Sequence, residues 1–566
     1  MKYPIAAVLS GCLFAGVVQA GMDQKIAPEL AGLAQTRKVG VIVQFAGKPT
    51  KRLHGLVSRH GGVLRRELAL IDSAAYEVPA ASIEKLAALP EVVRISSDGQ
   101  VKASMDVTAA TVGAPSAWSS YGLTGKGIGI AVIDTGVAYH TDLYNSSGSS
   151  RVVYNQYFRT DTTTDDLAGH GTHVAGIIAG RGANSAGTTY TRTFKGIAPE
   201  ANIINLAALD RFSSGKDSDV IAAIQKAVSL KSQYNIRVIN LSLGRGVSQS
   251  YKTDPLCQAV EKAWKAGIVV VAAAGNEGRN NSAGTQGYGT IAAPGNDPYV
   301  ITVGAAKTKG TTSRSDDAIA SYSSKGPTQF DHVVKPDIVA PGNQMVALLA
   351  GGGRMRNAYP SNGVLLQYFQ KNVTATNQRS DYYYWLSGTS MATPVVSGAV
   401  ALMLQRDPTL TPDQVKARLM KTAWKGFPLT STATDAATGA TYNSTHDIFT
   451  IGAGYLDIAA AVANTDKASA AALSPAVVWD AVNSRAVLDF SASGLNVVWG
   501  SNVVWGSNVV WGSNILSGTN VVWGSNVVWG ASGTGGFNVV WSDNVVWGDA
   551  SSIVAEADTL ALSGEN

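Results

Sequence analysis

Three short segments of the chain carry side chains that could act together in nucleophilic acyl transfer. An apolar stretch ends in Asp134, the segment GHGTHVAG carries His170, and the segment GTSMATP carries Ser390. A serine hydroxyl is a poor nucleophile until a base takes its proton, and imidazole suits that role near neutral pH. A carboxylate can fix the imidazole tautomer and stabilise its protonated form. Asp134, His170 and Ser390 are therefore the candidate catalytic residues.

Each of these residues taken alone also has another explanation. Asp134 could be a solvated carboxylate at a strand end, and Ser390 could cap the apolar helix that follows it. His170 and His173 are three residues apart, a spacing that can also hold zinc on a helix. A third ligand and a water-activating acid at the spacing of zinc peptidases do not accompany them in the sequence. The combination of the three residue types favours acyl transfer.

In their order and local sequence, these segments resemble the subtilisin-like serine peptidases, or subtilases. The resemblance covers most of residues 36–464. It implies that Asp134 is the orienting acid, His170 the general base and acid, and Ser390 the nucleophile. It also makes Asn276, in the segment AGNEG, the side-chain donor to the oxyanion, with the backbone N–H of Ser390 as the second donor.

The same resemblance locates the substrate. The segment Ser242, Leu243 and Gly244 would pair with an extended peptide along its backbone. The pocket for the residue before the cut would be lined by Ala274, Gly275 and Ala292. Because these residues are small and uncharged, we expect a broad preference for apolar or aromatic residues over Arg or Lys. The alternative is that these positions only pack.

The sequence matches the family's calcium site only in part. Asp142, in HTDL, matches a calcium position of the family, whereas residues 180–195 differ from the family's usual calcium loop. The resemblance thus allows a structural calcium ion at Asp142 and implies no cofactor for catalysis.

Residues 342–387 form a longer connection than is usual before the serine segment, and we expect its aromatic run, residues 382–385, at the rim of the cleft.

The elements around these residues predict an α/β fold. Between residues 107 and 464, apolar strands alternate with amphipathic helices, which predicts a doubly wound, mainly parallel sheet. Such a domain has its active site at the carboxyl ends of the strands. Residues 36–104 read as βαββαβ, a small α+β ferredoxin-like unit that resembles the family's inhibitory propeptide. The resemblance implies self-cleavage between residues 102 and 106.

Both ends of the chain have their own signals. Residues 1–20 have the features of a secretory signal peptide, followed by an N-terminal segment at 21–35. A lipobox ending at Cys12 is the rival interpretation, which would make the protein periplasmic or lipid-anchored instead of secreted. Residues 465–495 resemble a linker, and 550–566 form a C-terminal tail.

A hexapeptide repeat, NVVWGS, fills residues 496–549. Its period fits either four-residue strands joined by two-residue hairpin turns or one face of a β-helix. The repeat is either a stacked or partly ordered β-module, or a surface that attaches to glycans or other chains through tryptophan.

Composition excludes several other classes. The 566 residues carry 45 Lys and Arg against 40 Asp and Glu, without a basic block, so a nucleic-acid partner is not indicated. No apolar run reaches the ~18 residues of a transmembrane helix. With 2 cysteines there is no disulfide framework, and Cys257 is expected to be a small buried residue.

Taken together, the motifs and the resemblance lead us to expect a secreted serine endopeptidase, made as a self-processing zymogen, that acts on proteins or peptides and is inhibited by its own propeptide. The rivals are a binding protein with an inactive peptidase domain and an acyl transferase or ligase.

Overall fold

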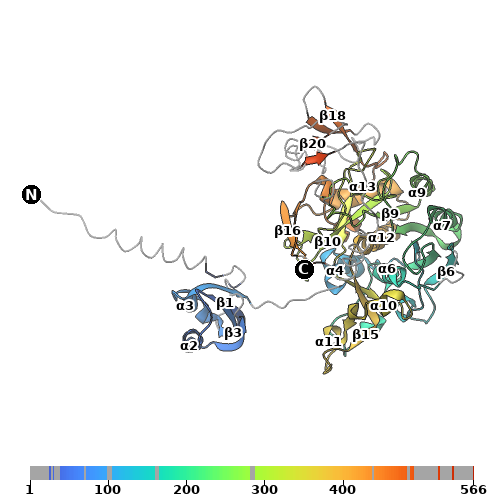
Figure 1. Ribbon diagram of the computed structural model, residues 1–566. Helices are drawn as coiled ribbons and strands as arrows, with labels where there is room; N and C mark the ends of the chain where they lie inside the picture. The colour runs from blue at the N-terminus through green and yellow to red at the C-terminus, as the bar shows by residue number, and fades with distance from the viewer. Residues whose placement is uncertain are drawn as a thin grey trace, which may run out of the picture. The chain divides into compact units, whose positions relative to one another are not determined.

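The protein divides into two compact units, Met1–Val101 and Lys102–Asn566 (Figure 1). The structure is a computed structural model, and it describes residues 25–26, 30, 38–68, 72–97, 105–159, 165–280, 287–435, 439–480, 485–489, 520–522, 538–540 and 565. The expected signal peptide and the lipobox at Cys12 lie outside the described residues, as do most of the repeats.

The first unit has the βαββαβ order that the sequence predicts. Its elements are β1 (Lys38–Phe45), α2 (Lys51–Arg59), β2 (Val63–Leu68), β3 (Ser73–Pro79), α3 (Ile83–Ala87) and β4 (Val92–Ser97). The strands form an antiparallel sheet in the order β2-β3-β1-β4. Val57 of α2 and Leu86 of α3 are buried against Val41, Val43 and Tyr76 of the sheet. Because the two helices share one face, this small unit has a core of its own.

A large sheet organises the second unit, in the order β11-β10-β9-β8-β5-β7-β6, with β12 beside β10. The strands are β5 (Gly129–Asp134), β6 (Val152–Tyr157), β7 (Asn202–Ala207), β8 (Ile236–Leu241), β9 (Val269–Ala273), β10 (Ile301–Lys307), β11 (Ala318–Ile319) and β12 (Ile338–Pro341). All pairs are parallel except β10 with β11. Strands such as β5 and β9 are buried along their whole length, as expected when helices cover both faces. The predicted doubly wound α/β fold is confirmed.

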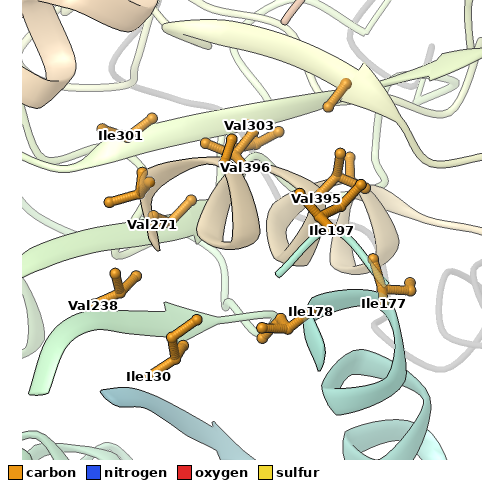
Figure 2. Close-up of a cluster of buried hydrophobic side chains, with 14 of the residues drawn as sticks. Ile130, Ile177, Ile178, Ile197, Val238, Val271, Ile301, Val303, Val395 and Val396 are labelled. Carbon is orange, nitrogen blue, oxygen red and sulfur yellow. The ribbon is translucent and has the colours of Figure 1, made fainter. Parts of the chain in front are cut away.

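Helices cover this sheet on both faces. They are α4 (Met105–Thr111), α5 (Ala114–Tyr121), α6 (His170–Ala179), α7 (Asp217–Ser229), α8 (Lys231–Tyr234), α9 (Pro255–Lys265), α12 (Thr389–Arg406), α13 (Pro412–Thr422), α14 (Ile448–Ile451) and α15 (Ile458–Ala463). Almost every residue of α12 up to Leu404 is buried, so this helix is apolar on all sides. Figure 2 shows Val395 and Val396 of α12 among side chains of β9, β10 and α6. The two helices that begin at the candidate histidine and serine segments therefore pack in one core.

The long connection before α12 folds into a small sheet of its own, in the order β13-β15-β14. Its elements are β13 (Met345–Leu348), α10 (Arg354–Ala358), β14 (Gly363–Leu365), α11 (Leu366–Phe369) and β15 (Arg379–Leu386). The connection lies against the start of α6, because the N–H of Met355 donates to the carbonyl of Ala168 at 2.9 Å. Tyr383 and Tyr384 are buried, which is contrary to the expectation that the aromatic run lines the rim, whereas Tyr382 is exposed and Trp385 is half-buried.

The region expected to be a linker is partly folded. Residues 476–480 and 485–489 form the hairpin β18 (Ala476–Asp480) and β19 (Arg485–Asp489). It is attached to the second unit, since Val477 is buried and its N–H donates to the carbonyl of His332 at 2.9 Å. Another hairpin joins β16 (Thr430–Thr434) to β17 (Thr441–Thr445).

Within the repeats, the structure describes β20 (Asn520–Val522) and β21 (Asn538–Val540). They pair in parallel, with Asn520 opposite Asn538 three repeats later. Of the two geometries that the sequence left open, a parallel pair in register has the pairing of a β-helix, since hairpin strands are antiparallel. Among the described helices, none combines the length and apolar character that a membrane crossing requires.

Candidate active site

His170 and Asp134 form a hydrogen-bonded pair at the carboxyl edge of the sheet. Asp134 is the last residue of β5, and His170 is the first residue of α6. The imidazole Nδ1 lies 2.7 Å from Asp134 Oδ1, and the side chains are 14% and 0% exposed. With Nδ1 engaged by the carboxylate, Nε2 is the nitrogen left to exchange a proton with a substrate or a nucleophile.

The pKa of His170 is set by opposing influences. Burial lowers it, but the charge of Asp134, the hydrogen bond to Asp134 and the charge of Asp166 together outweigh burial, so the pKa is raised above 6.5.

The surroundings of His173 shift its pKa in the opposite direction. It is fully buried, its Nε2 lies 3.0 Å from the carbonyl oxygen of Tyr384, and burial lowers its pKa to about 3. His173 is thus a packed core residue and does not join His170 in a metal site.

Asp166, which our sequence analysis missed, holds the start of α6. Its carboxylate accepts hydrogen bonds from the N–H groups of Gly169 at 2.7 Å and Thr172 at 2.8 Å. It also accepts from the hydroxyl of Thr135, which in turn accepts from the N–H of Gly171 at 2.9 Å. One buried carboxylate therefore ties the first turn of α6 to the residue that follows Asp134. An acid four residues before a helical histidine was the available signal.

Ser390 lies in the first turn of α12 and exchanges two hydrogen bonds with Ser242. Its hydroxyl donates to the carbonyl of Ser242 at 3.1 Å, and its own carbonyl accepts from Ser242 Oγ at 2.8 Å. The second bond has a clear cause: Pro394, four residues on, has no N–H to give to the Ser390 carbonyl. The hydrogen bond described for the Ser390 side chain thus leads to Ser242 and does not include His170.

Asn276 lies beside the same turn with its amide oriented by Thr389. Asn276 Oδ1 accepts from the N–H of Thr389 at 2.9 Å and from its hydroxyl at 3.0 Å. The Asn276 amide and the Ser390 nitrogen lie near the same glycine: a Cβ placed on Gly388 would be 3.4 Å from Asn276 Nδ2, 3.7 Å from Asn276 Oδ1 and 3.7 Å from the Ser390 nitrogen. The expected side-chain donor is thus close to the start of α12. Thr389 is a second residue that the sequence analysis missed.

The predicted substrate residues lie close together around this serine. Gly244 and Ala292 approach so closely that a Cβ on Gly244 would be 2.9 Å from the Ala292 Cβ. Gly275 has φ +106°, and a Cβ there would lie 3.2 Å from the same atom and 2.8 Å from Ser324 Oγ. The N–H of Ala292 donates to the carbonyl of Ala274 at 2.9 Å. Leu243 is half-buried and Gly244 exposed, so this segment is open to a peptide.

Asp142 is buried, but its surroundings do not fit a calcium ion. Its Oδ1 accepts from the N–H and the Nδ2 of Asn184 at 3.1 and 3.0 Å, and its Oδ2 accepts from the hydroxyl of Tyr383 at 2.7 Å. Calcium needs six to eight oxygen ligands, whereas this carboxylate faces hydrogen-bond donors. In the part of the chain that the structure describes, no three His, Cys, Asp or Glu side chains converge as a metal site.

Cys257 has the buried, structural character that the sequence predicts. The thiol is free and lies 3.3 Å from Asn296 Oδ1. Burial and nearby acidic residues raise its pKa well above the usual value, which makes it unreactive.

Comparison with known proteins agrees with this geometry. Residues 125–454 match the model of the subtilase family. The chain is 41% identical over 307 residues to the serine protease AprX of Bacillus subtilis, which covers 52% of this chain and 61% of AprX. It is 33% identical over 404 residues to subtilisin amylosacchariticus of Bacillus subtilis subsp. amylosacchariticus, which covers 70% of this chain and 87% of that protein. Subtilisin DY of Bacillus licheniformis is 36% identical over 303 residues, or 85% of its length. The chain therefore belongs to the subtilase family of serine endopeptidases.

Proposed function

We propose that this protein is a secreted serine endopeptidase, made as a self-processing zymogen, with Asp134, His170 and Ser390 as its catalytic triad. The observation that carries the proposal is the 2.7 Å contact between His170 Nδ1 and the buried Asp134 carboxylate. It leaves the imidazole oriented, with one nitrogen available, at the start of a helix that shares its core with the helix beginning at the serine segment.

The reaction follows from the positions of these groups. Ser390 Oγ bonds to the scissile carbonyl carbon while its proton passes to His170 Nε2, and Asp134 stabilises the imidazolium. Negative charge moves to the carbonyl oxygen, where Asn276 Nδ2 and the Ser390 N–H donate hydrogen bonds. The carbon–nitrogen bond then breaks, and His170 returns the proton to the leaving amine. Water repeats the two steps on the acyl-enzyme, which releases the acid and restores the serine.

Protein or peptide substrates would bind along residues 242–244. The close approach of Gly244, Gly275 and Ala292 supports a pocket with small, uncharged walls. Since Ala274, Gly275 and Ala292 bring no carboxylate to it, we expect apolar or aromatic residues before the cut to be preferred over Arg and Lys.

Maturation is proposed from the first unit. A separate βαββαβ domain ahead of the catalytic unit supports the role of a propeptide that inhibits the enzyme until it is cut off near residues 102–106. Secretion is proposed from the signal-like residues 1–20.

Replacing the nucleophile tests the proposal. We expect Ser390→Ala to abolish peptide hydrolysis and to leave the uncut precursor in a purified preparation, because no other group on the chain would start acyl transfer. Mass spectrometry of the purified chain and a peptide-library digest measure both effects. The matched control is Ser119→Ala, an exposed serine of α5, which should be processed and active. Normal processing of Ser390→Ala with no other peptidase present would refute self-maturation, and normal hydrolysis would refute the triad.

A further inference from the structure

A buried glutamate from the end of the chain is bound to the catalytic unit at a site that the proposed reaction does not use. Glu565, the penultimate residue, has a side chain only 2% exposed. Its partners are Arg279, Ser321 and Asn343, which lie more than 200 residues earlier in the sequence. All three belong to loops of the catalytic unit.

The carboxylate of Glu565 is held by charge-assisted hydrogen bonds. Arg279 Nη2 donates to Oε2 at 2.8 Å, the hydroxyl of Ser321 donates to Oε2 at 2.6 Å, and the N–H of Ser321 donates to Oε1. Lys307 Nζ lies 3.9 Å from Oε1. Hydrogen bonds of this kind are stronger than those between neutral groups. The site therefore recognises a carboxylate by shape and by charge.

The backbone of Glu565 is recognised as well. Its N–H donates to Asn343 Oδ1 at 2.9 Å, and Asn343 Nδ2 donates to its carbonyl at 2.6 Å. One amide side chain thus pairs with both polar backbone groups of a single residue, as a neighbouring strand would. A free carboxylate ion could not make these two bonds, so the site fits a glutamate within a peptide.

The charges around this position favour an acidic group. The guanidinium of Arg279 is 4% exposed, and it pairs with Asp435 at 2.8 Å as well as with Glu565. Lys307 brings a second positive charge near the Glu565 carboxylate. A buried carboxylate that is paired and hydrogen-bonded in this way keeps its charge at a lower cost than an isolated one.

The site is built from loops that other contacts already fix. The carbonyl of Gly342, next to Asn343, accepts from the N–H of Gly388 at 2.8 Å and from the hydroxyl of Tyr322 at 3.1 Å. The N–H of Gly278, next to Arg279, donates to the carbonyl of Tyr322 at 2.8 Å. These contacts do not involve Glu565, so the loops that form the site are also held by the rest of the catalytic unit.

We propose that the catalytic unit carries a docking site for a glutamate-containing peptide, that the C-terminal end of the chain occupies it through Glu565, and that the repeat segment is thereby tethered at both ends. At its start the repeat follows β19, whose partner β18 is attached to the catalytic unit. At its far end Glu565 would return the chain to the same unit. A cut inside the tail would then leave the C-terminal fragment bound without a covalent link.

The test uses the full chain carrying Ser390→Ala, with a recognition sequence for a site-specific protease inserted between residues 549 and 550. After cleavage, we expect the fragment to co-elute with the rest of the protein in size-exclusion chromatography. Glu565→Gln should release it, because the amide loses the charge and places an NH2 group against donors; a loss of affinity of about tenfold or more is expected. The matched control, Glu556→Gln in the same tail, should retain the fragment.

Two further measurements keep the outcome clear. The peptide ALSGEN should displace the wild-type fragment, and ALSGQN should not. Hydrogen exchange at the Ser321 amide, measured on the uncut chain, should be faster in Glu565→Gln even if that variant loses stability elsewhere. Release of the wild-type fragment on cleavage, or equal retention with Glu565→Gln, would overturn the proposal. None of these readouts needs an active triad, so this inference and the proposed function can fail separately.

Discussion

His170 is the residue whose chemistry the surroundings change most directly. Burial favours the neutral imidazole, whereas the carboxylates of Asp134 and Asp166 favour the charged one, and the carboxylates prevail. A raised pKa makes the imidazole a stronger base. It also means that the ion pair contributes most to stability at a pH below the usual histidine value of about 6.5, and loses that contribution as the pH rises through the raised value.

The pH dependence of activity follows from this shift. Since only neutral imidazole can take the serine proton, kcat/KM should fall on the acid side with an apparent pKa above 6.5, the ordinary value for His170. Asp134→Asn should move this limb to lower pH, because the charge that raises the pKa is gone. It should also lower turnover by about 10⁴-fold, a magnitude known from serine-peptidase triads, including that of subtilisin itself. A pH–rate profile of both forms measures the two effects. An acid limb that is unchanged in Asp134→Asn would contradict the pairing.

Residue types and spacing were enough to select Asp134, His170 and Ser390, because glycine-rich turns around each one leave a local pattern. The structure brings His170 and Asp134 into contact and places Asn276 beside the serine turn. Asp166 was not predicted because most of its partners are backbone N–H groups, which every sequence has. The hydrogen bond from Ser242 Oγ to the carbonyl of Ser390 was not predicted either, because its acceptor is a backbone group. Pro394 was the available signal, since it leaves that carbonyl without its usual helical donor.

At the scale of elements, the regular strands and helices were predictable and the long connection was not. Strands such as β5 and β9 are continuous apolar runs, which a doubly covered parallel sheet requires. The sheet β13-β15-β14 depends instead on contacts far along the chain, such as the bond from Tyr383 to Asp142 across 241 positions. No local pattern reports such a contact, which is why the aromatic run was expected at the cleft.

The hydrogen bond from the Tyr383 hydroxyl to Asp142 predicts how a substitution at Tyr383 changes the stability of the protein. Tyr383→Phe should lower the free energy of unfolding by about 1.5–3 kcal/mol, because the buried carboxylate of Asp142 loses a hydrogen-bond donor. Calorimetry measures the change, and Tyr382→Phe, an exposed neighbour, is the control.

The same contacts predict the response to EDTA. Because Asn184 and Tyr383 already donate to both oxygens of Asp142, EDTA should leave the midpoint of thermal unfolding unchanged. Calorimetry with and without EDTA measures this, and a large fall of the midpoint would show that a bound cation stabilises the protein.

At the scale of the whole molecule, the catalytic unit extends beyond the boundary that composition suggested. The stretch expected to be a linker contributes β18 and β19, and Glu565 is bound to Arg279 of the same unit. The sequence could not reveal that return, because a single glutamate near a terminus carries no pattern. The repeat, by contrast, was evident from its period, and the parallel pair β20–β21 spans three of its units.

If Asp134, His170 and Ser390 act as one catalytic unit, covalent labelling should find Ser390 activated by His170. The full chain is treated with a fluorophosphonate, which reacts with serines activated by a neighbouring base, and the modified peptide is identified by mass spectrometry. We expect one adduct, on Ser390, formed rapidly in the wild-type chain and very slowly in His170→Ala. An adduct on another residue, or equally rapid labelling of Ser390 in His170→Ala, would contradict it.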